Sequence, residues 1–489
     1  MNLSKENLLS IQGKNITKPA DAIFSLPEKV LQFGTGVLLR GLPDYFIDKA
    51  NRQGLFNGRI VVVKSTDSGD AGAFDRQDGL YTLCVRGIED GHKVEENIIC
   101  SAISRVLSAR DQWQEILALA RNPEMQIVIS NTTEVGIQLV EDDIRRQPPA
   151  SFPGKLLAFL YERYKAFGGS AESGMVIVPT ELIVDNGKKL AAIVKELTQM
   201  NALEADFLLW MEKHCHFCSS LVDRIVPGKP DAASLQQLTH DLGYTDDLLS
   251  ISEVYRLWAI EGNEKVKTVL SFAAADEGVI IEPDIEIYRE LKLRLLNGTH
   301  TLSCGLAYLA GFGTVKQAMD DGAFSAFVSD LMLKEIAPAI PYEVSLSVAR
   351  DFGLRVLDRF RNPHLQHQWL SITLQFSSKL KSRDIPVLLR HYQLHDTPPP
   401  HFALGFAAYL LFMKGGSHPV NDDKAGYFAE LWQTPETIVN TALKDKSLWG
   451  TDLTKLPGFE KAVKNNLDSL INKGATATLA GVAEQKTIL

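Results

Sequence analysis

The stretch that decides the fold is Phe33-Gly34-Thr35-Gly36-Val37-Leu38-Leu39-Arg40-Gly41. A short apolar run, residues 29–32, precedes it, and Pro43 opens an apolar pattern at helical spacing after it. Proline is favoured in the first helical turn, where its missing N–H is not needed. The order is therefore strand, glycine loop and helix, an arrangement whose backbone can hold a pyrophosphate. The spacing G-x-G-x-x-x-x-G departs from G-x-G-x-x-G, so a plain glycine turn remains an equal interpretation of this stretch alone.

Further along the chain, three continuous apolar runs have the composition of buried parallel strands: residues 59–63, 126–130 and 174–179. Polar residues follow the second run, and ligands of doubly wound sheets bind just beyond such strand ends. The sequence therefore predicts the α/β class, with an N-terminal Rossmann-like doubly wound sheet. The expected cofactor-binding residues are Phe33, Gly34, Thr35, Gly36, Val37, Asp67, Asn131, Thr132 and Glu134.

The choice of cofactor depends on the residues that follow the second strand. Asp67 suits the ribose hydroxyls of NAD, because an acid after this strand commonly binds them. Lys64 equally suits the 2′-phosphate of NADP. The sequence leaves both cofactors open and favours NAD.

Length and composition limit the remaining possibilities. A chain of 489 residues predicts two domains, and the change from strand-like to helical texture places their boundary near Pro283. We expect a dinucleotide-binding domain over residues 1–282 and a mainly α-helical substrate and catalytic domain over residues 283–489. The net charge of −9 argues against nucleic-acid binding. The apolar run 402–413 is too short for a membrane span and predicts a buried helix.

The location and assembly follow from equally general features. The N-terminus has no apolar signal segment, and five cysteines are too few for a disulfide framework in a chain of this size. Both features predict a cytoplasmic protein. The sequence does not distinguish a monomer from a dimer.

A second polar stretch, Lys292-Leu-Arg-Leu-Leu-Asn297-Gly-Thr-His300, opens the helical domain. An α-helix turns about 100° per residue, so Lys292, Asn297 and His300 would lie within about 140° of one face. A lysine can exchange a proton with a substrate, and an amide can donate a hydrogen bond to a reacting oxygen. Taken alone, the stretch is explained equally well by a solvated lysine beside an asparagine and a histidine with structural partners.

Other polar residues allow both a structural and a functional interpretation. Asn186, which precedes a glycine, predicts a turn or an amide placed at a strand end. Asp223 and Arg224 predict either a salt bridge or a site for a polyhydroxylated acid. Arg359 and Asn362 predict either a capped helix end or a grip on a carboxylate or hydroxyl.

The segment His214-Cys215-His216-Phe217-Cys218 has the composition of a metal site. However, no second ligand pair with matching spacing is present in the sequence. In a strand, alternate side chains point to opposite faces, so the four ligands could not converge. We therefore expect no metal.

These motifs together resemble the polyol-specific long-chain dehydrogenases, the family of mannitol dehydrogenase and the hexuronate-pathway reductases. The resemblance covers nearly the whole chain. It rests on four segments: Phe33-Gly34-x-Gly36, Asn131-Thr-Thr-Glu134, Phe217-x-x-Ser220-x-Val222-Asp223-Arg224-Ile225-x-Pro227 and Lys292-x-x-x-x-Asn297-x-x-His300. Cys215 departs from the family pattern, which prefers an aliphatic residue or tyrosine there.

A branch of this family interconverts tagaturonate and altronate, and four phrases resemble it. They are Gln77-Asp-Gly-Leu-Tyr81, Asn122-Pro-Glu-Met125, Glu181-Leu-Ile183 with Asn186-Gly187, and Arg359-Phe-Arg-Asn-Pro363. Members that act on fructuronate or mannitol more often read Cys-Asp-Asn where this chain has Val184-Asp185-Asn186. Those substrates remain as alternatives.

The resemblance implies hydride transfer between NAD and a secondary alcohol of an open-chain sugar acid, without zinc. It casts Lys292 as the general acid/base, Asn186 and Asn297 as donors to the reacting oxygen, and His300 as the group that orients it. Arginine could not replace this lysine, because a guanidinium stays protonated. The expected substrate-binding residues are Asp223, Arg224, Arg359 and Asn362.

Overall fold

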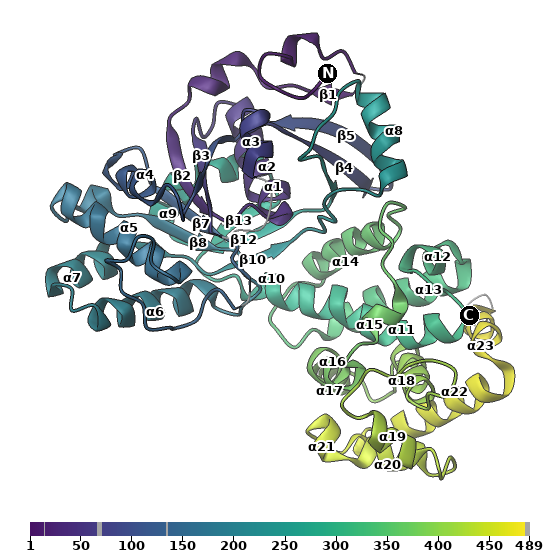
Figure 1. Ribbon diagram of the computed structural model, residues 1–489. Helices are drawn as coiled ribbons and strands as arrows, with labels where there is room; N and C mark the ends of the chain where they lie inside the picture. The colour runs from purple at the N-terminus through teal and green to yellow at the C-terminus, as the bar shows by residue number, and fades with distance from the viewer. Residues whose placement is uncertain (14, 66–70, 134, 485–489) are drawn as a thin grey trace. The chain divides into compact units, whose positions relative to one another are not determined.

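The structure is a computed structural model that describes residues 1–13, 15–65, 71–133 and 135–484 (Figure 1). The chain forms two compact units. Unit 1 comprises Met1–Arg86 and Lys93–Ile285, and unit 2 comprises Gly87–His92 and Glu286–Leu489. The division after Ile285 lies three residues beyond the boundary expected from the sequence. The tip of one hairpin, Gly87–His92, belongs with unit 2, which no pattern in the sequence indicates.

Unit 1 is built on a six-stranded parallel sheet in the order β6-β3-β2-β7-β8-β9. The strands are β2 (Glu28–Phe33), β3 (Arg59–Lys64), β6 (Ile103–Ser108), β7 (Ile127–Ser130), β8 (Val176–Pro179) and β9 (His216–Phe217). The chain moves outward from β2 through β3 to β6, and then returns to the other side of β2 with β7. This reversal is the topological switch point of a doubly wound sheet. The predicted fold class and the three predicted strands are confirmed.

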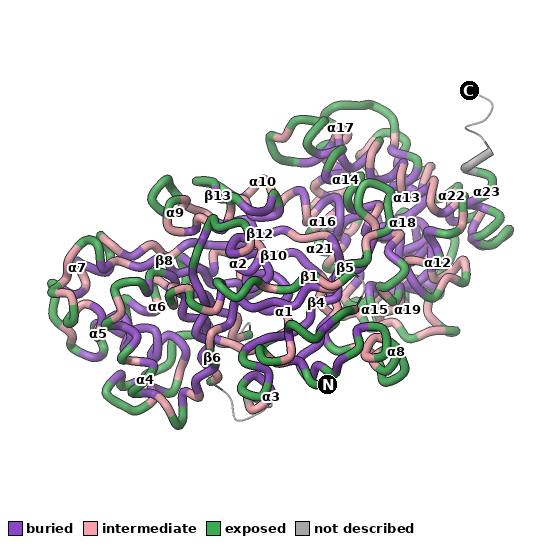
Figure 2. Tube along the Cα trace, turned by 90° about the horizontal axis from the view of Figure 1, so that it is seen from above, coloured by how far each residue is buried: buried purple, intermediate pink, exposed green. Residues whose placement is uncertain are grey.

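Both faces of this sheet are buried, which explains the continuous apolar runs. Val62 and Ile129 join one hydrophobic cluster, whereas Val61 and Val128 join the other. The second cluster contains residues of α4–α7, so these helices cover that face. Figure 2 shows exposed residues along α7, on the outside of this layer. The helices of unit 1 are α1 (Val37–Gly41), α2 (Pro43–Arg52), α3 (Ala71–Arg76), α4 (Trp113–Ala118), α5 (Phe152–Phe167), α6 (Asn186–Met200), α7 (Ala205–His214), α8 (Ala232–Leu242) and α9 (Glu264–Val269).

Two smaller sheets complete unit 1. One has the order β1-β5-β4-β11, with β1 (Ile16–Thr17), β4 (Tyr81–Glu89), β5 (His92–Cys100) and β11 (Ser250–Glu253). The other has the order β10-β12-β13, with β10 (Ser220–Asp223), β12 (Leu257–Glu261) and β13 (Val279–Glu282). The first hydrophobic cluster draws residues from both smaller sheets and from α1 and α2, so these elements cover the other face of the large sheet.

Unit 2 is mainly helical, as predicted, and its centre is α18 (Pro400–Phe412). Residues on every side of α18 are buried, and the helix packs against α11 (Thr299–Leu309) and α22 (Phe459–Lys473). The predicted buried helix over residues 402–413 is therefore confirmed. None of the helices in the described ranges has both the length and the apolar character that crossing a membrane requires.

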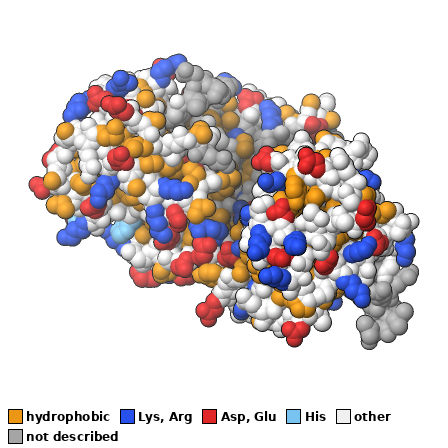
Figure 3. All heavy atoms as spheres, turned by 90° about the horizontal axis from the view of Figure 1, so that it is seen from below, with side chains coloured by type: hydrophobic (Ala, Val, Ile, Leu, Met, Phe, Trp, Pro, Cys, Tyr) orange, Lys and Arg blue, Asp and Glu red, His pale blue; other side chains and the backbone are white. Residues whose placement is uncertain are grey.

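The other helices of unit 2 surround this centre. They are α10 (Glu286–Leu291), α12 (Val315–Asp320), α13 (Gly322–Asp330), α14 (Leu346–Phe360), α15 (Trp369–Ile372), α16 (Phe376–Arg383), α17 (Ile385–Leu394), α19 (Ala425–Leu431), α20 (Ile438–Lys444), α21 (Lys446–Trp449) and α23 (Ala475–Glu484). Two π-helical segments are labelled η6 (Lys292–Gly298) and η7 (Leu331–Ile336). Basic and acidic side chains are interspersed over the face shown in Figure 3.

Candidate active site

The stretch that begins at Lys292 is a π-helical segment, η6, rather than the α-helix expected from the sequence. It continues α10 and leads directly into α11, so one helical rod runs from Glu286 to Leu309. A π-helix joins residues five apart, whereas an α-helix joins residues four apart. Lys292 and Asn297 are five apart, so the π segment brings them to the same side of the rod. In an α-helix they would lie about 140° apart. Both side chains are half-buried.

Two arginines fix this segment against the junction of α16 and α17. Arg294 donates from Nη1 to the carbonyl oxygens of Ser382 and Arg383, both at 2.7 Å, and its Nε donates to Glu290 at 2.9 Å. Arg383 in turn donates to Thr301 Oγ1 at 3.1 Å and to the carbonyl oxygen of Asn297 at 3.4 Å. The π segment is therefore held from both ends.

His300, one turn after Asn297, lies in an aromatic enclosure. Its ring stacks on Phe360 with centroids 4.1 Å apart and meets His367 and Trp369 edge-on, at 5.1 and 5.9 Å. Burial, and then the charges of His367 and Arg359, hold the pKa of His300 well below its usual value, so the imidazole is neutral at pH 7. Its Nε2 is buried and has no hydrogen-bond partner within the described ranges. A neutral imidazole with one unused ring nitrogen suits a substrate hydroxyl or carbonyl.

Three cationic side chains lie near enough to this imidazole to lower its pKa. Arg359, at the end of α14, and Lys379 and Arg383, on α16, all act on His300 electrostatically. Burial and the neighbouring Arg383 lower the pKa of Lys379. Asn362 is buried, and its side-chain oxygen accepts from the backbone N–H of His364 at 3.0 Å. The cluster of Arg359, Lys379 and Arg383 is an environment for an anion, and Lys379 and Arg383 carry no motif that marks them in the sequence.

The glycine loop of unit 1 lies at the C-terminal end of β2, beside the switch point. Gly34 has a φ of +125°, and a Cβ there would lie 2.9 Å from the carbonyl oxygen of Asn131. Gly36, by contrast, has open space where a Cβ would be. Open space at Gly36 leaves room for a ligand, which is what a dinucleotide requires of this loop. The following helix, α1, begins at Val37, six residues earlier than the helix expected at Pro43, where α2 begins.

A pocket of about 330 Å³ lies beside this loop. Its lining residues are Leu38, Asn131, Thr133, Val135, Glu181 and Leu182. Asn131 and Thr133 follow β7, and Glu181 and Leu182 follow β8, so the pocket opens at the strand ends beyond the switch point. Asn131 donates to the side chain and the carbonyl oxygen of Thr180, at 3.0 and 3.1 Å. Glu181 follows a predicted strand, which is the signal that would have identified it as a site residue.

The remaining residues predicted to bind the cofactor are placed as follows. Phe33 is fully buried as the last residue of β2, Thr35 lies in the glycine loop, and Val37 is the first residue of α1. Asp67 and Glu134, expected to bind the cofactor, lie outside the described residues.

The structure places Asn186, predicted to donate to a reacting oxygen, among backbone groups at the start of a helix. This residue begins α6, is fully buried, and donates to the carbonyl oxygens of Pro179, Glu181 and Ser220 at 3.0–3.1 Å. Its side-chain oxygen accepts from the N–H groups of Gly187 and Ser220. These hydrogen bonds support the turn after β8, and the role of Asn186 as a donor to a reacting oxygen stays a prediction.

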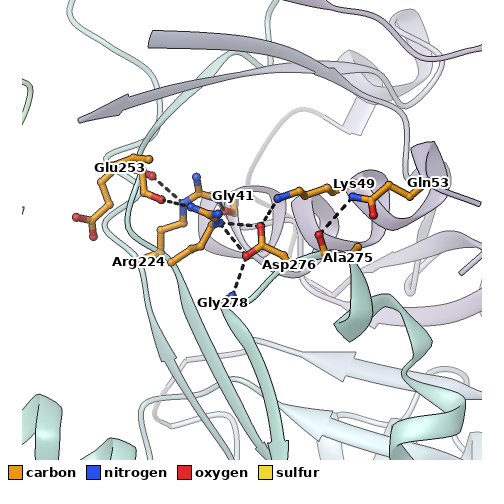
Figure 4. Close-up of polar contacts among 10 residues, drawn as sticks. Gly41, Lys49, Gln53, Arg224, Glu253, Ala275, Asp276 and Gly278 are labelled. Atoms are coloured by element: carbon orange, nitrogen blue, oxygen red, sulfur yellow. Dashed lines mark hydrogen bonds and ion pairs between the residues drawn. The ribbon is translucent and has the colours of Figure 1, made fainter. Parts of the chain in front are cut away.

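Arg224, predicted to bind a substrate carboxylate, also contacts backbone groups. It is buried and donates to the carbonyl oxygens of Gly41, at 2.6 Å, and Glu253, at 2.9 Å (Figure 4). Its guanidinium also lies 4.5 Å from the centre of the Tyr45 ring. These contacts tie the end of β10 to α1 and β11. The buried Nη2 of Arg224 has no hydrogen-bond partner among the described residues, and the expected grip on a substrate carboxylate stays a prediction. Asp223 is buried at the end of β10.

Asp276 anchors the same region. Lys49 contacts its carboxylate at 2.7 Å (Figure 4), and Arg256 contacts it at 2.8 Å. Burial acts to raise the pKa of Asp276, but the two cations outweigh it and lower the pKa.

The segment from His214 to Cys218 does not converge on one point. Cys215 packs into the hydrophobic cluster on one face of the large sheet, and Cys218 packs into the cluster on the other. Burial raises the pKa of each thiol to about 12, so neither is a thiolate at neutral pH. Within the described residues, no three His, Cys, Asp or Glu side chains are placed to share a metal ion.

Comparison with known proteins identifies the two units. Residues 28–272 match the mannitol dehydrogenase Rossmann domain, and residues 284–471 match the mannitol dehydrogenase C-terminal domain. The chain belongs to the mannitol dehydrogenase family. The family resemblance predicted from the sequence is thereby confirmed, and the chain is an oxidoreductase of this dehydrogenase family.

Individual members of the mannitol dehydrogenase family match almost the whole chain. The altronate oxidoreductase of Bacillus subtilis (strain 168) is 38% identical over 460 residues, covering 93% of this chain and 95% of that protein. The altronate oxidoreductase of Yersinia enterocolitica is 38% identical over 475 residues, covering 93% and 97%. The mannitol 2-dehydrogenase of Pseudomonas fluorescens, in a ternary complex with NAD and D-mannitol, shares the fold with a TM-score of 0.66 at 24% identity. That alignment covers 99% of this chain and 100% of that chain.

Proposed function

We propose that this protein is an NAD-dependent oxidoreductase that interconverts D-tagaturonate and D-altronate without a metal ion. Two altronate oxidoreductases support the substrate, since each is 38% identical to this chain over nearly its full length. The observation that carries the proposal is the cluster of Arg359, Lys379 and Arg383 around His300, because this cluster suits a substrate that bears a carboxylate. A neutral polyol has no negative charge with which these three cations could form an ion pair.

The chemistry of the π segment fits the reduction of a ketone. Bound NADH would supply the hydride, and negative charge would then build on the substrate oxygen. Asn297 donates a hydrogen bond to that oxygen, an interaction commonly worth a few kcal/mol. Lys292 donates the proton that converts the alkoxide to the alcohol, and accepts it in the reverse direction. The π-helical register supports this assignment, because it places both side chains on one side of the rod.

His300 orients the substrate in this proposal. Its Nε2 is directed to no described protein group, and its lowered pKa keeps the ring neutral. The neutral form retains one nitrogen that can accept a hydrogen bond, so His300 can contact a substrate hydroxyl without competing with Lys292 for the transferred proton.

The substrate carboxylate is assigned to Arg359 and Lys379. Lys379 is half-buried and its Nζ has one described acceptor, the carbonyl oxygen of Ile372 at 3.1 Å. Asn362, buried three residues after Arg359, and Asp223 remain candidates for substrate hydroxyls. Arg383 is assigned a supporting role, because it holds the backbone of Asn297.

We assign the cofactor-binding site to the loop of Gly34, Thr35 and Gly36 and to the strand ends beyond it. The open space at Gly36 and the pocket at Asn131 and Thr133 are what the proposal requires of a dinucleotide site. NAD is favoured over NADP by the mannitol dehydrogenase that was solved with NAD. The five cysteines are free and buried, which is consistent with the reducing cytoplasm that the proposal includes.

The test offers purified protein the ketoacids tagaturonate and fructuronate, and the neutral ketose fructose, each with NADH and with NADPH. Loss of reduced-cofactor absorbance is followed. We expect tagaturonate with NADH to give the highest kcat/KM. A preference for fructose would refute the carboxylate site, and a preference for fructuronate would reassign the substrate.

A matched pair of variants tests the carboxylate site itself. Lys379→Met is expected to raise KM for tagaturonate about tenfold, the usual order for a lost charge contact, and to leave fructose kinetics unchanged. Lys334→Met, at an exposed lysine of η7, is the control and is expected to change neither. Equal losses with both substrates would contradict the assignment of Lys379.

A further inference from the structure

Glu181 is the one ionisable side chain among the described residues that line the pocket beside the glycine loop. Only 3% of it is exposed. It directly follows β8, so it lies at the sheet edge where doubly wound folds bind ligands. A buried carboxylate at such a place needs an explanation, because burying a charge is unfavourable unless something compensates it.

Three hydrogen-bond donors compensate part of this charge. One carboxylate oxygen accepts from the backbone N–H of Thr132 at 2.8 Å and from its hydroxyl at 3.0 Å. The other accepts from the hydroxyl of Ser130 at 3.1 Å. Within the described ranges Glu181 makes no ion pair with a lysine or arginine. Burial raises the pKa of Glu181 above its usual value, whereas the three donors act to lower it, and no cationic neighbour adds to their effect.

The turn that Glu181 holds is strained. Thr133 has a φ of +89°, which is unusual for a β-branched residue. Thr133 lines the pocket, and the residue before it, Thr132, is bound twice by Glu181. Strained backbone persists where surrounding contacts hold it, and it is concentrated at binding sites. Glu181 therefore fixes the part of the pocket wall that follows β7.

We propose that Glu181 is a positioning residue for the nicotinamide, and that its buried negative charge makes the site favour the oxidised, cationic ring over the reduced, neutral one. The inference rests on the proposed function, which places a nicotinamide cofactor at this sheet edge. The two mononucleotide-binding halves of a doubly wound sheet share the pyrophosphate at the switch point. The half beyond β7 and β8 then receives the nicotinamide, because the acid expected to bind the adenosine ribose follows β3.

The charge argument gives a specific signature. A carboxylate attracts a nearby cation strongly in a site of low dielectric constant, and acts little on a neutral ring. Oxidised and reduced cofactors share every other part of the molecule. The ratio of their dissociation constants therefore isolates the effect of Glu181 on the ring charge, since contacts to the shared parts cancel.

The test measures the dissociation constants of NAD⁺ and NADH by calorimetry in the full-length protein. Glu181→Gln keeps the size of the side chain and removes its charge. It is expected to weaken NAD⁺ binding about tenfold more than NADH binding, the order expected for one partly buried charge contact. Glu181→Asp keeps the charge and is expected to retain the wild-type ratio even if both constants change.

Asp142, in the connection between β7 and α5, provides a matched control. It is buried, and its carboxylate accepts from the N–H groups of Ala150 and Ser151, at 3.0 and 2.7 Å, and from the Ser151 hydroxyl at 2.8 Å. It does not line the pocket. Asp142→Asn therefore removes a similar buried charge and is expected to leave the NAD⁺ to NADH ratio unchanged.

The outcomes separate three cases. If Glu181→Gln weakens the binding of NAD⁺ and NADH equally, Glu181 has a purely structural role and the charge effect is refuted. An unchanged ratio of dissociation constants with intact binding refutes it as well. If wild-type protein binds neither cofactor, the proposed function itself fails. If Glu181→Gln does not fold, the ratio is measured in Lys292→Ala protein as the pH is lowered from neutral toward 4.5, because burial raises the pKa of Glu181 above that usual value. The preference for NAD⁺ is then expected to fall as Glu181 takes up its proton, and a flat ratio refutes the inference.

Discussion

Replacing Gly298 by alanine tests whether the π segment is held in place by close packing. Gly298 has an ordinary helical φ of −65°, so its backbone conformation does not require glycine. In a typical helix interior the substitution would stabilise the protein by about 1 kcal/mol. Here, however, an added Cβ would lie 2.6 Å from Oδ1 of Asp384, which is fully buried.

The magnitude follows from these two opposing effects. Ordinary contact begins at 3.4 Å, so the alanine lacks 0.8 Å of space. Overpacking of this kind costs about 1–3 kcal/mol, which exceeds the propensity gain. We expect a net loss of about 1 kcal/mol in the free energy of unfolding. We also expect a lower kcat, because the rod must shift at the segment that carries Lys292 and Asn297.

The assay is thermal and urea unfolding together with steady-state kinetics. The control is Gly426→Ala in α19, where a Cβ meets nothing within 4 Å, and a small gain in stability is expected. In an Asp384→Ala background the clash is absent, so Gly298→Ala is expected to become neutral or stabilising. Equal destabilisation in both backgrounds, or a stabilising effect in the wild type, would refute the packing argument.

Three further predictions address other parts of the account. Arg224→Met leaves the carbonyl oxygens of Gly41 and Glu253 without their donor. We expect it to lower the free energy of unfolding by about 2–4 kcal/mol and to leave KM for the acid substrate unchanged. A raised KM with normal stability would instead indicate that Arg224 is a substrate ligand. The pKa of His300 is lowered from 6.5 on folding, so the unfolded state binds more protons below that pH and His300 contributes stability that is lost as the pH falls. His300→Gln is expected to flatten the acid side of the stability curve by up to about 1.4 kcal/mol per pH unit, and parallel curves would contradict the buried neutral imidazole. Treatment with EDTA is expected to leave turnover unchanged, whereas loss of activity that zinc restores would revive a metal site at His214–Cys218.

The doubly wound sheet was predictable because buried parallel strands require continuous apolar runs, and these runs are visible in the sequence. Residues 59–63, 126–130 and 174–179 all became strands of the large sheet. The sheet of β4 and β5 was not predicted. The first six residues of β5, His92–Asn97, are exposed or partly buried, so this strand carries no strong apolar signal.

The candidate site was predictable to a smaller extent. Lys292, Asn297 and His300 were singled out by their spacing. The π-helical register was not predicted, because the segment is held by contacts with Ser382 and Arg383, which are distant in the sequence. Asn186 and Arg224 were given substrate roles because their side chains suit such contacts. The sequence does not show that both side chains donate hydrogen bonds to backbone carbonyl oxygens.

The central claim is that Lys292 exchanges a proton with the substrate during hydride transfer from NADH. A single-turnover experiment with enzyme-bound NADH and tagaturonate tests it most directly, by comparing the wild type with Lys292→Ala. We expect Lys292→Ala to bind NADH with wild-type affinity and to oxidise it at least about 100-fold more slowly, the lower range for loss of a general acid. Oxidation of NADH by Lys292→Ala at the wild-type rate would contradict the account.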